Sequence, residues 1–232
     1  MKSIGRIVLA LASDSYDNCL AYLDGRLGEL FNQLQQDGML DRTIVIVAAD
    51  HGEGLGEHDL FDHGESLYRP EIRVPLVIVP RSEEPFGTVV DECVSLREIP
   101  ATIADLVGAG GKSPFPGRSL ARLSAEKKSA TAAVRPGEGV LSELSAPNPN
   151  DPNQGRSPAY RGPLISLAEG DFVYIRNEGD GSEELFNERE DPRELTDRSG
   201  AEAMQPIVRR FRAQLDQLKR TGQNGSNRDG SP

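Results

Sequence analysis

A continuous run of β-branched and small apolar residues, Thr43–Ala49 (TIVIVAA), is the feature that most constrains the fold. The run does not alternate between polar and apolar residues, which is typical of a strand covered on both faces in a parallel sheet. It follows the segment Tyr16–Gln36, whose apolar residues recur at the three- and four-residue spacings of an amphipathic helix. Gly38 is the expected terminator of that helix. Helix, short turn and buried strand together predict an α/β layer structure.

The rest of the chain predicts two regions and a tail. Further strands are expected at Arg73–Val79, Val89–Val94, Gly139–Leu144, on both sides of Glu169–Asp171 and at Glu183–Glu190, with helices at Leu96–Val107 and Ala201–Leu218. The segment Ala146–Pro163, rich in Pro and Asn, is expected to be a loop with Arg156, Tyr160 and Arg161 as exposed residues. We therefore predict a partial mixed sheet flanked by helices in residues 1–125 and a small antiparallel sheet with a C-terminal helix in residues 126–220. Residues 221–232 are expected to be a disordered tail.

The charge of the chain excludes some classes of partner. The formal net charge is -11 in 232 residues. Nucleic acids and anionic membranes select basic surfaces, so this charge argues against both as partners. No apolar run approaches the roughly 18 residues of a membrane span. Cys19 and Cys93 make no disulfide framework, and each lies in an apolar pattern, so both are expected to be core thiols.

All three histidines of the chain lie within thirteen residues, as His51, His58 and His63. Asp50 and His51 directly follow the predicted strand, and ligands of open α/β sheets bind at the carboxyl ends of strands. A carboxylate and an imidazole together suit a divalent cation. A protonated His63 suits hydrogen bonding to an anionic oxygen or general-acid catalysis. The alternative is that this acidic loop is a solvated face, but its place between two strands favours a site.

Several segments, in the same order along the chain, resemble the sulfatases of the alkaline phosphatase superfamily. The resemblance rests on YDNCLAYLDGRLGELFNQL, LDRTIVIVAADHGEGLGEH, HGESLYRPEIRVPLVIV, VSLREIPATIADLVG, FPGRSL, GDFVYIRN and EELFNEREDPRELTD. It covers roughly Tyr16–Leu218 and implies an alkaline-phosphatase-like sheet. It further implies that Asp50 and His51 are metal ligands, with Ca²⁺ the usual ion. His63 would contact the sulfate oxygens and take part in catalysis, and His58 would face the substrate.

One departure from the family pattern limits what the resemblance implies. Sulfatases carry a Cys/Ser-x-Pro-x-Arg motif that provides the nucleophile, and no Cys or Ser of this sequence begins such a motif. The amino-terminal Asp pair of the family is also missing from the few residues before Tyr16. The sequence therefore resembles the carboxyl-terminal portion of a sulfatase, and we expect this chain alone to be inactive.

Three functions stay open at this point. The first is hydrolysis of a small-molecule or carbohydrate sulfate ester, and the second is hydrolysis of a phosphate or phosphonate ester by the same metal pair. The third is a non-catalytic remnant that binds a metal or an anion. An exposed edge of the partial sheet would in that case favour self-association.

Overall fold

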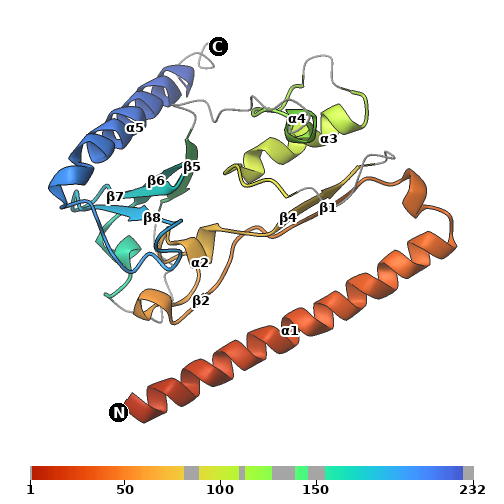
Figure 1. Cartoon of the computed structure of the whole chain (residues 1–232), viewed down its shortest axis with the longest axis horizontal. Coiled ribbons are helices and arrows are strands. Elements are labelled where there is room, and N and C mark those ends of the chain that lie inside the picture. Colours follow the sequence, from red (N-terminus) through yellow and green to blue (C-terminus); the bar gives the residue numbers. More distant parts are fainter. Residues whose placement is uncertain (1, 81–88, 110–112, 127–138, 146–154, 227–232) are drawn as a thin grey trace. The chain divides into compact units, whose positions relative to one another are not determined.

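The computed structural model describes residues 2–80, 89–109, 113–126, 139–145 and 155–226 (Figure 1). The chain forms two compact units. Unit 1 comprises Met1–Asp62, Arg73–Val90 and Leu96–Ala130, and unit 2 comprises His63–Ile72, Asp91–Ser95 and Thr131–Pro232. Both helices and sheets are present, as the predicted α/β class requires.

Unit 1 contains one long helix, several short helices and two small antiparallel sheets. Its elements are α1 (Lys2–Gln36), η1 (Leu40–Arg42), β1 (Val45–Ala48), β2 (Gly54–Leu55), η2 (Glu57–Asp59), β3 (Phe61–Asp62), β4 (Leu76–Val79), η3 (Leu96–Glu98), α3 (Ile99–Leu106) and α4 (Ala121–Glu126). Helix α1 begins well before the expected Tyr16. It ends at Gln36, two residues before the predicted terminator Gly38, whose φ of 62° belongs to the left-handed region that glycine adopts most readily.

Strand β1 pairs with β4 in antiparallel register, with Val45 opposite Val79 and Ala48 opposite Leu76. Among the described residues, β1 thus pairs only with an antiparallel neighbour, so the expectation that it belongs to a parallel sheet is wrong. The chain returns to β1 through two short turns of helix, not through the helical crossover that parallel strands require. The predicted strand at Val89–Val94 is also wrong. This segment forms no strand, because Asp91 and Glu92 interrupt its apolar residues and Val89 is 71% exposed.

The helix predicted at Leu96–Val107 is confirmed as η3 followed by α3. The buried Thr102 joins it to the following turn, since its hydroxyl donates to the carbonyl of Glu98 (2.7 Å) and accepts from the amide of Leu120 (2.9 Å). Gly117 lets that turn approach closely: its φ is 93°, and an added Cβ would lie 3.2 Å from the carbonyl oxygen of Arg97.

Unit 2 is built on a four-stranded antiparallel sheet in the order β5-β6-β7-β8. Its elements are α2 (Arg69–Ile72), β5 (Val140–Leu144), η4 (Pro158–Arg161), β6 (Leu164–Glu169), β7 (Phe172–Asn177), β8 (Glu183–Asn187), η5 (Glu202–Met204) and α5 (Gln205–Ser226). The predicted meander is confirmed, and Gly170, with a φ of 61°, occupies the turn between β6 and β7.

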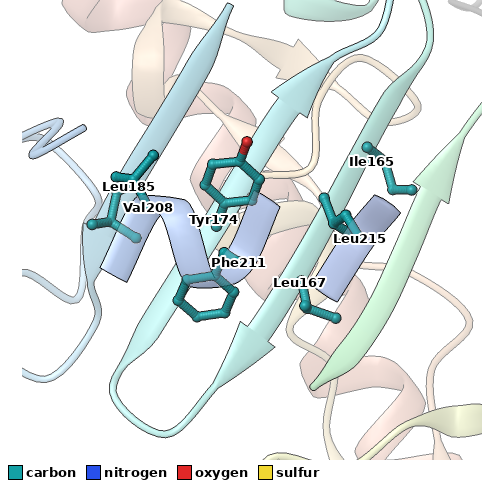
Figure 2. Close-up of a cluster of buried hydrophobic side chains, with 7 residues drawn as sticks. All are labelled: Ile165, Leu167, Tyr174, Leu185, Val208, Phe211 and Leu215. Carbon is teal, nitrogen blue, oxygen red and sulfur yellow. The ribbon is translucent and has the colours of Figure 1, made fainter. Parts of the chain in front are cut away.

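Helix α5 covers one face of this sheet (Figure 2). Leu167, Tyr174 and Leu185 are opposite one another in the register of β6, β7 and β8, so their side chains share a face. The rings of Tyr174 and Phe211 stack there at 5.8 Å, and α5 adds further apolar side chains at helical spacing. The complete cluster is Ile165, Leu167, Tyr174, Leu185, Val208, Phe211 and Leu215.

The opposite face of the sheet is also buried, which the sequence analysis did not anticipate. Phe186 follows Leu185 in β8, so its side chain points to the other face. There the ring of Tyr68 meets it edge-on at 6.0 Å. The segment His63–Ile72, more than one hundred residues before β8, thus belongs to the same compact unit.

Two remaining expectations differ from what the described residues show. Cys19 and Cys93 are exposed, so the expectation of core thiols is wrong for both. Helix α5 continues to Ser226, which corrects the predicted start of the tail, and residues 227–232 lie outside the described part. Among the described helices, none has an apolar run long enough to cross a membrane.

Candidate functional site

Asp50 and His51 follow β1 as predicted, and both are accessible to solvent. The side chain of Asp50 is 91% exposed and that of His51 45% exposed. The His51 amide donates to Oδ1 of Asp50 at 3.0 Å, and His51 Nδ1 lies 2.8 Å from the carbonyl oxygen of Gly52. The ring nitrogen Nε2 of His51 lies 3.9 Å from Oδ2 of Asp50. A carboxylate oxygen and an imidazole nitrogen therefore stand side by side on an open surface.

The loop after this pair folds into a short hairpin, with β2 antiparallel to β3. Gly54 permits the close approach of the two arms, since an added Cβ would lie 3.0 Å from the carbonyl oxygen of Asp62. His58, Asp59 and Asp62 have φ values of 54°, 58° and 76°, in the left-handed region that costs a side chain free energy. Such a backbone is found where the surrounding structure fixes a loop in one conformation.

His58 and His63 occupy different parts of this loop. His58 is half-buried within η2. A ring nitrogen of His63 and one carboxylate oxygen each from Glu53 and Asp62 lie within 4.8 Å of one another. Among the described residues, this group of possible metal ligands does not include Asp50 or His51. The two predicted ligands thus form a sequential pair, while His63 has two acidic neighbours that the sequence analysis did not single out as ligands.

These donors suit a divalent cation in type. Carboxylate oxygens match the hard-oxygen preference of Ca²⁺, and imidazole nitrogens are more usual for transition metals. Ca²⁺ takes about six to eight oxygen ligands, so Asp50 and His51 would supply only a part of its coordination.

The residues that immobilise the chain after His63 were not predicted. Glu71 is buried, and its Oε2 accepts hydrogen bonds from the amides of Gly64 (2.8 Å) and Glu65 (3.1 Å). Its Oε1 accepts a hydrogen bond from the hydroxyl of Ser66. The one available sequence signal is Gly64, whose φ of 78° marks the tight turn.

Two further carboxyl groups contact this segment from the region of β8. The hydroxyl of Tyr68 donates to both oxygens of Glu184 at 3.0 Å, and the amide of Arg69 donates to Oε2 of Glu194 at 2.7 Å. Burial raises the pKa of Glu194 to about 7, with Glu188 and Glu184 adding to the rise and Arg69 opposing it. Burial likewise raises the pKa values of Glu184 and Tyr68.

The remaining predicted residues are exposed in unit 2, and unit 1 contains an apolar hollow. Tyr160 and Arg161 are exposed as expected, and Arg161 pairs with Asp180 at 3.2 Å. An apolar hollow in unit 1 is lined by Arg42, Ile44, Ile46, Ile103 and Val107 and includes no residue predicted to form the site.

Comparison with known proteins agrees with the predicted fold and family. The family model described as Sulfatase matches residues 11–109, which contain β1 and the whole histidine loop. A choline-sulfatase of Rhizobium meliloti is 32% identical over 180 residues, covering 76% of this chain and 31% of the relative. Arylsulfatase K of Xenopus laevis is 29% identical over 205 residues, covering 86% of this chain and 36% of the relative.

Solved structures extend the similarity to both units. The phosphonate monoester hydrolase SpPMH from Silicibacter pomeroyi superposes with a TM-score of 0.66 at 24% identity, covering 85% of this chain and 38% of that one. The fold is therefore of the alkaline-phosphatase-like class. The chain belongs to the sulfatase family and spans about a third of the length of the curated relatives it matches.

Proposed function

We propose that this chain carries the metal-binding and sulfate-binding part of a sulfuric-ester hydrolase site. The observation that carries the proposal is the position of Asp50 and His51, one residue beyond the end of β1 and inside the segment that matches the sulfatase family. The substrate class is a small-molecule or carbohydrate sulfate ester.

Each candidate residue has a distinct role in this proposal. Asp50 and His51 hold a divalent cation, Ca²⁺, which when bound withdraws electrons from the sulfate group as a Lewis acid. His63 donates a hydrogen bond to a sulfate oxygen or a proton to the departing alcohol. His58 faces the substrate. We assign the nucleophile to no residue of this chain, because none begins a Cys/Ser-x-Pro-x-Arg motif.

Hydrolysis of a phosphate or phosphonate ester is the second candidate. It is favoured by the fold similarity to the phosphonate monoester hydrolase. Phosphonate monoesters carry one negative charge near neutral pH, as sulfate monoesters do, whereas phosphate monoesters carry nearly two. Charge therefore does not separate a sulfate ester from a phosphonate ester at this site. The match to the Sulfatase family model and to sulfatase relatives favours sulfate as the primary candidate.

Calorimetric titration with CaCl₂ tests the metal site. We expect Asp50→Asn to raise the calcium Kd by about tenfold or more, since it removes a charged ligand worth at least ~1.4 kcal/mol. Asp41→Asn is the matched control, because Asp41 is an exposed aspartate nine residues earlier, within η1. Equal calcium affinity in the Asp50→Asn variant and wild type would remove Asp50 from the site.

Titration with sodium sulfate and sodium phosphate tests the anion. We expect His63→Gln to weaken sulfate binding in the presence of Ca²⁺, with sulfate preferred over phosphate in wild type. Preference for phosphate would move the second candidate to the front. Calcium binding with no affinity for either anion would leave a non-catalytic metal-binding remnant.

A further inference from the structure

The turn that begins at His63 is closed by a buried carboxylate from the same segment. Glu71 lies eight residues after His63, and its two oxygens accept three hydrogen bonds from the three residues that directly follow the histidine. Because two of the donors are backbone amides, these bonds fix the path of the chain as it leaves His63. Both Glu71 and Ser66 are at most 5% exposed, so water competes little for these bonds.

The segment before β6 also holds this turn, through the carbonyl group of Glu65. The carbonyl oxygen of Glu65 accepts from the hydroxyl of Ser157 (2.8 Å) and from the amide of Ala159 (3.1 Å). Glu65 itself is fully buried. Glu71 therefore fixes the amide of Glu65, and the segment before β6 fixes the carbonyl group of the same residue.

The far end of the segment is fixed as well. Glu194 accepts from the amide of Arg69, two residues before Glu71, and the guanidinium of Arg69 donates to the carbonyl of Pro192 at 3.2 Å. These contacts limit the positions that α2, and hence the carboxylate of Glu71, can take.

We propose that Glu71 is a positioning residue for His63. Its carboxylate holds the backbone turn at Gly64–Ser66 so that the imidazole is presented in one orientation, and it takes no part in metal binding or proton transfer. This inference rests on the proposed role of His63 as the residue that contacts the sulfate group.

The chemistry of Glu71 separates a positioning role from a chemical one. A glutamine at this position keeps one oxygen for the amides of Gly64 and Glu65, and its NH₂ group donates to the Ser66 hydroxyl, which then acts as an acceptor. Glutamine has no charge and no titratable proton, so it would replace a charged metal ligand only in part and would not replace a general base. Alanine supplies neither function.

Nuclear magnetic resonance of the histidine rings is the test. The full chain has three histidines, so the ¹H–¹⁵N ring signals are assigned by one His→Gln variant for each. We expect Glu71→Ala to shift the His63 ring signal and to raise the sulfate Kd by about tenfold. We expect Glu71→Gln to return both values to within about twofold of wild type. Glu202→Ala, at an exposed glutamate in η5, is the control and should change neither value.

Each outcome decides for or against the proposal. An unchanged His63 signal and sulfate affinity in Glu71→Ala would overturn it, as would a Glu71→Gln variant as impaired as Glu71→Ala. If Glu71→Ala does not fold, Ser66→Ala removes one of the three bonds and should shift the His63 signal, whereas no shift would count against the proposal.

Failure of the proposed function gives a different result. Wild type would then show no response of His63 to sulfate, while the ring signal and the amide exchange of Gly64 and Glu65 would still respond to Glu71→Ala and recover in Glu71→Gln. The role of Glu71 is therefore tested even if the ligand is wrong.

Discussion

The loop from Asp50 to Asp62 and the segment from His63 to Ile72 are adjacent in the sequence, yet the structure holds them in different ways. In the loop, the two predicted metal ligands are exposed and three residues adopt left-handed backbone conformations. In the segment, Glu65–Tyr68 are four consecutive buried residues, and carboxyl groups fix the backbone. Residues that meet a ligand must stay accessible, whereas residues that orient them gain precision from burial.

The largest expected effect on stability comes from the difference between a buried ring beneath α5 and a partly exposed ring in unit 1. Phe211→Ala removes a fully buried ring that stacks on Tyr174, and should lower the free energy of unfolding by about 3–5 kcal/mol in urea denaturation. Phe115→Ala is the same substitution in unit 1, at a ring that is 48% exposed, and should cost about 1 kcal/mol or less. Similar losses for the two variants would show that the core beneath α5 does not dominate stability.

An intermediate effect depends on pH and concerns the buried anchor of the segment. Burial raises the pKa of Glu194 from 4.5 to about 7. The folded chain therefore keeps a proton that the unfolded chain has released, and the free energy of unfolding should fall as the pH rises from about 4.5 to about 7. The loss should reach about 3 kcal/mol and level off at higher pH.

Denaturation at a series of pH values, in wild type and Glu194→Gln, measures this contribution. Glutamine accepts the same hydrogen bond from Arg69 without titrating, so the variant should lose most of the slope. The charged groups that act on Glu194, namely Glu188, Glu184 and Arg69, remain in both proteins. Glu202→Gln is the exposed control and should keep the wild-type slope. Parallel curves for wild type and Glu194→Gln would contradict the prediction.

The smallest effect concerns the backbone of the loop. Asp59 has a φ of 58°, whereas Asp41 lies in the helical turn η1. Glycine relieves the left-handed conformation at position 59 but only adds unfolded-state entropy at position 41, so Asp59→Gly should leave the chain about 1 kcal/mol more stable than Asp41→Gly. Thermal unfolding of the two variants measures the difference. Equal melting temperatures would mean that the loop is not held in this backbone conformation.

Local patterns in the sequence predicted individual helices and strands better than they predicted which elements pack against one another. Helical spacing indicated α1, α3 and α5, and the turn at Gly170 indicated the β6–β7 hairpin, because each of these depends on residues close together in the chain. The failure at Val89–Val94 has the opposite cause. Its apolar residues favour a strand, but that preference depends on packing against neighbouring strands, and Val89 is exposed.

The candidate site shows the same limit. Residue type and position in the loop after a strand made Asp50 and His51 candidates, and residue type together with the family resemblance made His63 one. Glu71 and Glu194 were missed, although both lie in segments that resemble the sulfatases, because nothing in the local pattern marks either carboxylate as buried. Glu194 contacts Arg69 across 125 residues of sequence, and no periodicity connects positions so far apart. A usable signal was present in β6 and β7, where both faces are apolar and a second covering layer is therefore required.

The membership of His63–Ile72 in unit 2 bears on how such a protein can be dissected or recombined. Unit 2 is assembled from three separate stretches of chain, so no single cut releases it whole. A truncation that starts at residue 131 would leave Phe186 without the ring of Tyr68, and Glu184 and Glu194 without their donors. Exchange of the C-terminal region between family members would likewise have to carry this ten-residue insert along, or match it, to preserve the sheet.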